Sequence, residues 1–200
     1  MKKEDWEIPA NLQPDPSDYS FDLERTLKAV VSLKTYVPAD AFTAGSLGTE
    51  RAGSGVMIKN TGLIATIGYL ITEAETLWIT SNDGQAVPGH ALAYDQESGF
   101  GLVQTLGKLD VPSLELGDSD RLKVGDQAVL AAGGGRHHSI ETQIVGRQEF
   151  AGYWEYVLDD ALFTAPADTC FIRPHQRNSD RLARAYVHPP LRWQGFPGES

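Results

Sequence analysis

Short apolar segments bounded by turn residues recur along most of this chain, and they constrain its fold more than any other feature. β-Branched and aromatic residues fill the run from Val30 to Val37, which stops at Pro38. Further runs flank residues 59–62 (KNTG) and 82–84 (NDG), which have the composition of tight turns. Regular spacing of short strands and turns predicts an all-β protein built on a closed antiparallel barrel.

The strand signals fall into two groups along the chain. The sequence predicts strands at residues 30–37, 55–58, 63–66, 76–80, 86–94 and 101–105, and then at 127–132, 140–150, 153–158 and 161–165. Residues 39–51 are small and polar and are predicted to form a loop between strands. We therefore expect a first barrel over residues 29–106, a connection over 107–121 and a partial second barrel over 122–167.

The two ends of the chain differ from this β-rich middle. Three prolines lie among polar residues in 1–17, which predicts an extended arm, and Asp18 is predicted to cap a short helix that ends near Lys28, so that residues 1–28 precede the first barrel. Residues 168–200 hold five arginines, no lysine, three acidic residues and four prolines. They are predicted to form an irregular tail of low order.

Charge and cysteine content restrict the classes of partner. The formal net charge is −10, with 17 basic and 27 acidic residues, and this disfavours binding to nucleic acid or anionic lipid. Because no apolar stretch follows the first lysines or approaches the length of a membrane span, we expect a cytoplasmic protein that does not act at a membrane. A peptide or protein partner is the default expectation. The single cysteine, Cys170, has no partner for a disulfide or a zinc site.

No cofactor or metal is predicted from the remaining candidates. His137 and His138 are adjacent, so on a strand they would point to opposite faces and could not bind one ion together. The glycines at 133–135 follow an apolar run as a phosphate loop would, but their spacing matches no nucleotide fingerprint. The aromatic residues at 150, 153, 154 and 156 fit barrel packing, with a ligand-binding shelf as the alternative.

The order of motifs resembles the trypsin-like serine proteases of the HtrA (Deg) type. Residues 53–58 (GSGVMI) with 61–64 (TGLI) are similar to the family's GSGVII and DGYILT hairpin, and 80–84 (TSNDG) to its LSDG turn. The strongest match is 114–126 (LELGDSDRLKVGD), which is similar to LGDSDKLRVGD. The resemblance implies two six-stranded β-barrels with the active site in the cleft between them. The second barrel is incomplete here, because only about four strands are predicted in it.

The resemblance also places the three catalytic positions, and all three differ in this chain. The segment 65–71 (ATIGYLI) puts Tyr69 where the family has its histidine, and Gly99 stands at the aspartate position. An ungapped match puts Arg173 at the nucleophilic serine, although Ser179 follows an asparagine as the motif's serine does. Asp95 matches a different acidic position and is interpreted as a turn residue. A phenol is protonated near neutral pH and does not replace an imidazole as a general base.

These residues leave three hypotheses for function. The first is a catalytically inactive pseudo-protease that binds peptide or protein partners. The second is an active hydrolase or peptidase that uses other residues, for example Tyr69 or Cys170. The third is a nucleotide-binding regulator that uses Gly133 to Gly135.

Overall fold

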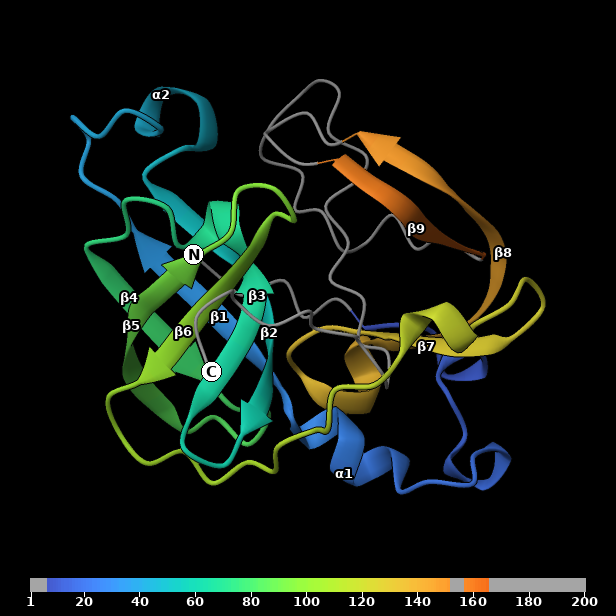
Figure 1. Cartoon of the computed structure of the whole chain (residues 1–200). Helices are drawn as coiled ribbons and strands as arrows, with labels where there is room; N and C mark the ends of the chain where they lie inside the picture. The colour runs from blue at the N-terminus through green and yellow to red at the C-terminus, as the bar shows by residue number, and fades with distance from the viewer. Residues whose placement is uncertain (1–6, 152–156, 166–200) are drawn as a thin grey trace, which may run out of the picture.

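Two β units make up the protein, a closed barrel and an open three-stranded sheet (Figure 1). The computed structural model describes residues 7–151 and 157–165. Strands dominate the described residues, and the helices are short. The prediction of an all-β fold with a short N-terminal helix and an incomplete second barrel is confirmed.

Six antiparallel strands form the barrel in the order β1-β2-β3-β6-β5-β4. Their bounds are β1 Val30–Tyr36, β2 Glu50–Lys59, β3 Leu63–Ile67, β4 Thr76–Thr80, β5 Ala86–Tyr94 and β6 Phe100–Thr105. Strand β1 closes the barrel because it pairs with β2 on one edge and β4 on the other, so that Ser32 lies opposite both Ser54 and Thr80. Closure removes the unpaired edges that an open sheet of six strands would keep.

The barrel interior is filled by aliphatic side chains from its strands and from the connections at its ends. Alternate residues of each strand point inward, and the buried members are Val31, Leu33, Met57, Ile64, Leu70, Ile71, Leu77, Ile79, Val87, Val103 and Leu109. A buried hydroxyl adds a polar tie, since Thr35 Oγ1 donates to the carbonyl of Leu70 at 2.7 Å. This contact fixes the segment after β3 to the first strand.

The second unit is a meander of β7 Gln127–Ala131, β8 Ser139–Ala151 and β9 Val157–Ala165. Its order is β7-β8-β9, so within the described residues each outer strand has a neighbour on one side only. Leu130 and Ile140 face each other across β7 and β8, and Ile8 of the N-terminal segment covers them. The sheet therefore has a smaller core than the barrel.

Short helices occupy the N-terminal segment and the connections. Residues predicted as an extended arm and a loop contain η1 Ala10–Leu12, η2 Pro16–Asp18 and α2 Ala44–Leu47, and the connections hold η3 Gly68–Leu70, η4 Ser119–Arg121 and η5 Gly135–His138. The predicted cap of the N-terminal helix is wrong. Helix α1 spans Leu23–Lys28, and Asp22 caps it by accepting a hydrogen bond from Arg25 N at 3.0 Å. Asp18 instead ends η2.

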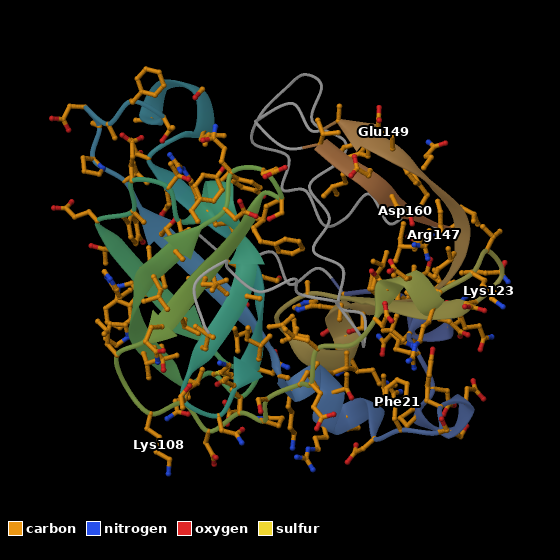
Figure 2. All side chains as sticks on the ribbon, viewed as in Figure 1. Phe21, Lys108, Lys123, Arg147, Glu149 and Asp160 are labelled. Carbon is orange, nitrogen blue, oxygen red and sulfur yellow. The ribbon has the colours of Figure 1, made fainter. Side chains whose placement is uncertain are left out.

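Two strand predictions also need correction. Strand β2 begins at Glu50, several residues before the predicted start. Strand β9 continues through Asp159 and Asp160, where the sequence suggested a break between two strands. The acidic pair is tolerated because Asp160 forms an ion pair with Arg147 of β8, as Figure 2 shows.

Several predictions concern parts of the chain that the structure leaves undescribed. The predicted tail 168–200 and the start of the predicted strand 153–158 lie outside the described residues, together with most of the aromatic group. Phe150 is described, and its ring lies 6.3 Å from that of Phe163 in an edge-on arrangement. This contact is cross-strand packing between β8 and β9.

Replacing a buried barrel residue tests the assignment of the core. Leu33 is 1% exposed and Leu106 is 66% exposed. We expect Leu33→Ala to lower the free energy of unfolding by about 2–5 kcal/mol, because it removes apolar contacts and leaves a cavity. The matched change Leu106→Ala is expected to cost less than about 1 kcal/mol. Urea denaturation followed by tryptophan fluorescence measures both, and equal losses would contradict the assignment.

Candidate functional site

Two of the three positions that the family resemblance matches to the catalytic triad lie on neighbouring segments at one end of the barrel. Tyr69 lies on η3, directly after β3, and Gly99 lies in the turn between β5 and β6. The backbone N–H of Gly68 donates to the carbonyl of Gly99 at 2.7 Å, which joins the two segments. The arrangement therefore places the position that matches the histidine beside the one that matches the aspartate.

Close packing fixes η3 against the neighbouring turn. A Cβ atom on Gly68 would lie only 1.9 Å from the ring of Tyr94, so this position requires glycine unless the ring moves. A Cβ on Gly101 would meet the Ile71 side chain at 2.7 Å and the Gly68 Cα at 3.2 Å. These glycines let backbone and ring approach closely, and they hold Tyr69 at a defined place.

The turn from Asp95 to Gly99 has its own hydrogen bonds. The Asp95 carboxylate accepts from the Ser98 hydroxyl at 2.5 Å and from Glu97 N at 3.3 Å. The Ser98 hydroxyl is the main cause that lowers the pKa of Asp95 below its usual value. Gly99 ends the turn with φ +74°, a conformation in which glycine is not strained. Asp95 thus serves the turn, as predicted for it.

Arg51 organises the segment that carries Tyr69. Arg51 is 4% exposed, and its guanidinium donates to the carbonyls of Tyr69 at 2.7 Å and Thr72 at 2.9 Å. It also donates to Gly48 O at 3.2 Å and to Thr43 Oγ1 at 2.7 Å. Burial lowers the pKa of Arg51, and the Glu73 carboxylate opposes that change. The sequence analysis missed this residue, because the acceptors come from separate segments.

Glu73 completes the same network from the other side. Its carboxylate accepts from the Thr43 hydroxyl, from Thr43 N at 2.7 Å and from Phe42 N at 3.0 Å. The Thr43 hydroxyl is the main cause that lowers the pKa of Glu73, and the two backbone N–H groups act in the same direction. Glu73 has φ 58°, which is uncommon for a residue with a side chain. The connection between β1 and β2 is thereby attached to the segment after η3.

The glycine-rich segment after β7 uses two of its backbone N–H groups in contacts with the barrel. Gly133 N donates to Ser54 Oγ at 3.1 Å and Gly134 N donates to Asn82 Oδ1 at 2.6 Å. A Cβ on Gly133 would lie 2.2 Å from Ser32 Oγ, so the segment packs directly on the barrel. These contacts use two of the three N–H groups on which the nucleotide hypothesis depends.

The motif at 114–126 forms a loop around an arginine that the sequence analysis did not identify. Arg147 Nη1 donates to Ser119 O at 2.8 Å and Leu122 O at 2.6 Å, while the side chain pairs with Asp160 (Figure 2). Asp126 accepts from Lys123 N at 2.8 Å and closes the tight turn of the motif. The contact with Asp160 is the main cause that raises the pKa of Arg147. The motif is structural in this chain.

The remaining candidates contribute no described geometry. Arg173, Ser179 and Cys170 lie outside the described residues, so the nucleophile position is not placed. Within residues 7–151 and 157–165 no group of three or more histidine, cysteine, aspartate or glutamate side chains is arranged to hold a metal ion. The helices of the same part are also too short or too polar to cross a membrane.

Comparison with known proteins agrees with this architecture. A family model described as a trypsin-like peptidase domain matches residues 53–171, which is more than half of the chain. The periplasmic pH-dependent serine endoprotease DegQ of Escherichia coli is 33% identical over 81 residues, covering 40% of this chain and 18% of its own length. A probable periplasmic serine endoprotease of DegP-like type from Pseudomonas putida is 32% identical over 98 residues, covering 48% and 20%.

Solved structures show the same fold. The HtrA-type protease AlgW with a tripeptide aligns with a TM-score of 0.53 and 18% identity, over 66% of this chain and 41% of that one. A variant of AlgW with a decapeptide aligns with a TM-score of 0.55 and 18% identity, over 70% and 48%. The fold and motifs thus define a trypsin-like protein of the HtrA type. The chain belongs to the trypsin-like peptidase domain family, and its matches span about a fifth of the length of these curated relatives.

The Arg51 network makes a prediction about stability. Arg51→Met keeps an unbranched, largely apolar stem but removes the donors to four acceptors, so we expect the free energy of unfolding to fall by about 2–4 kcal/mol. Arg121→Met is the matched control, because the Arg121 side chain is 82% exposed and its ion pair among the described residues is with Asp118, three positions before it. Urea denaturation compares the two. An equal effect of both changes would show that the network contributes nothing beyond a surface charge.

Proposed function

We propose that this protein is a catalytically inactive member of the trypsin-like family that acts in peptide or protein binding. One observation carries the proposal. The segments of Tyr69 and Gly99 lie side by side, joined by a hydrogen bond of 2.7 Å, where the family resemblance puts the histidine and the aspartate. The two segments that would carry a general base and its orienting carboxylate lie together, and the matching positions hold a phenol and a glycine.

The chemistry of the family explains why this loss matters. A serine nucleophile needs a base that accepts its proton near neutral pH and a carboxylate that holds that base in one tautomer. Tyr69 carries a phenol, a side-chain type that is protonated near neutral pH, and Gly99 has no side chain. Asp95 does not substitute for the missing carboxylate, because the Ser98 hydroxyl and the turn backbone already engage it.

Support for a binding role comes from the fold and from named relatives. AlgW, which shares the fold, has been solved with a tripeptide and with a decapeptide, so this architecture is compatible with peptide ligands. The chain keeps two features of the scaffold, a closed barrel and the hydrogen-bonded turn at the end of the 114–126 motif. A trypsin-like scaffold without the general base is suited to binding a peptide that it does not hydrolyse.

The alternative is an active hydrolase or peptidase that uses other residues. Tyr69 is the described candidate, while Cys170, Arg173 and Ser179 lie outside the described part. A fluorophosphonate probe and an iodoacetamide probe distinguish the two functions, because an activated hydroxyl or thiol is labelled faster than an inert one. The proposal expects labelling no faster than that of the urea-unfolded chain.

Purified protein should not hydrolyse casein or unfolded peptides above background at pH 7–8. Without its triad a protease of this kind retains at most about 10³ to 10⁴ in acceleration over water. Tyr69→His alone should not create activity, because the imidazole would have no carboxylate beside it. Release of fluorescence from labelled casein measures both proteins.

The control is Tyr36→Phe, a change on an exposed tyrosine of β1. A tested active HtrA-type protease under the same conditions shows that the assay detects turnover. Hydrolysis that copurifies with the protein and disappears in Tyr69→Phe but not in Tyr36→Phe would overturn the proposal.

A cytoplasmic location remains part of the proposal. The curated relatives named above are periplasmic by their descriptions, whereas we propose the cytoplasm for this chain. Fractionation of the producing cells decides between the two compartments. Recovery from the periplasmic fraction would contradict the prediction.

A further inference from the structure

A cavity lies between the N-terminal segment and the edge strand of the open sheet, away from Tyr69 and Gly99. Its volume is about 370 Å³. Tyr19, Phe21, Leu23 and Leu27 line one wall and residues 127–129 and 131 of β7 line the other. Phe21 is labelled in Figure 2, where it lies in the segment next to β7. The volume lies at the lower end of the range of ligand-binding sites, and the lining combines apolar side chains with the polar Asp18, Ser20 and Gln127.

The cavity follows the backbone of β7 and not just one of its faces. Successive side chains of a strand point to opposite faces, so a cavity lined by three consecutive residues, Gln127, Ala128 and Val129, runs along the edge of the strand. Strand β8 pairs with one edge of β7. No described strand pairs with the opposite edge, which lies along the cavity. The cavity therefore opens onto an edge of β7 that no strand pairs with in the described part of the chain.

The register shows which backbone groups face the cavity. Ala132 N donates to His138 O, and Ile144 N donates to Asp126 O, so the even-numbered residues of β7 bond to β8. Because antiparallel bonding alternates, the N–H and C=O groups of Gln127 and Val129 point away from β8. These groups offer donors and acceptors to a further strand.

A buried hydroxyl in the cavity wall also lacks a partner. Tyr19 Oη is screened from solvent and makes no hydrogen bond within the described part of the chain. An unpaired buried hydroxyl costs about 1–3 kcal/mol, so a ligand acceptor at this wall would be stabilised. Burial is the main cause that raises the pKa of Tyr19 to about 12, and hence the hydroxyl stays protonated and able to donate.

Acidic groups set the charge that this cavity accepts. Asp18 lines it, and Glu141 stands opposite Val129 on β8. Both carboxylates act on Tyr19 in the direction that raises its pKa, which shows a negative potential at the hydroxyl. Anionic ligands are disfavoured there, and a ligand with basic side chains beside its apolar part is favoured.

We propose that this cavity binds an extended peptide with apolar and basic side chains, which pairs as an added strand with the free edge of β7. An apolar side chain enters the space between Tyr19 and Val129, and the Tyr19 ring turns so that Oη, which solvent does not reach in the free protein, donates to a peptide carbonyl. Addition of a strand to a sheet edge supplies affinity through the backbone and selectivity through the pocket. The inference rests on the proposed role in peptide binding and assigns that role a place.

The test is isothermal titration calorimetry of the full chain with the synthetic peptide acetyl-KVLVK-amide. Binding is expected for this peptide, and binding at least tenfold weaker is expected for acetyl-EVLVE-amide, which meets the acidic wall. The peptide acetyl-KVPVK-amide should also bind at least tenfold more weakly, because proline removes a backbone donor and disfavours strand pairing. Equal binding of all three peptides would overturn the proposal.

Two variants locate the site. Val129→Pro removes an N–H that points away from β8 and leaves the β7–β8 bonds intact, so it should abolish peptide binding while the unfolding transition of the chain persists. Tyr19→Phe should weaken binding about fivefold through the lost hydroxyl. Tyr36→Phe is the control for a tyrosine outside the cavity and should leave binding unchanged.

The outcomes separate this inference from the proposed function. Peptide binding that survives both Val129→Pro and Tyr19→Phe would overturn the β7 site while leaving a peptide-binding pseudo-protease in place. Casein hydrolysis together with binding that Val129→Pro abolishes would overturn the inactive function and retain the site. Self-association that Val129→Pro abolishes, without binding of acetyl-KVLVK-amide, would overturn the inference in favour of a second copy of the chain.

Discussion

The pairing of β1 with both β2 and β4 is the constraint on which the rest of the structure depends. It closes the barrel, encloses the aliphatic core and brings the connections at one end into contact. Through Thr35 Oγ1 and Leu70 O, β1 also holds the segment after β3, where Tyr69 lies. The site positions are therefore a consequence of barrel closure, and the Arg51 network adds a second attachment at the same place.

Retention of this geometry does not require the catalytic groups. Gly68 and Gly99 meet through their backbones, and Arg51 binds carbonyl oxygens, so these contacts do not depend on which side chain stands at position 69. A trypsin-like scaffold can thus keep its form after its reactive groups change. The same independence allows a binding surface to develop elsewhere on the molecule. The edge of β7 offers backbone N–H and C=O groups for pairing, whereas the strands of the closed barrel already pair on both sides.

Sequence reasoning succeeded where local pattern decides structure and failed where distant segments decide it. Strands β4 and β5 were predicted with correct bounds, because β-rich runs there end at clear turns. The acidic pair Asp159 and Asp160 suggested a break that Arg147, thirteen residues from Asp160, prevents. Tyr69 and Gly99 were identified through the family resemblance, whereas Arg51 binds carbonyls of residues 18 and 21 positions away and no local pattern marks it.

The two β units also differ in how far along the chain their contacts reach, and this affects the chain entropy that their pairings cost. In the open sheet, neighbouring strands are consecutive in sequence, so each can form as a hairpin. Closure of the barrel instead joins Ser32 to Thr80 and Leu63 to Gln104, contacts that carry a large loop-closure entropy before any core is gained. The two pairings that close the barrel, β1 with β4 and β3 with β6, therefore cost more chain entropy than any pairing of the meander.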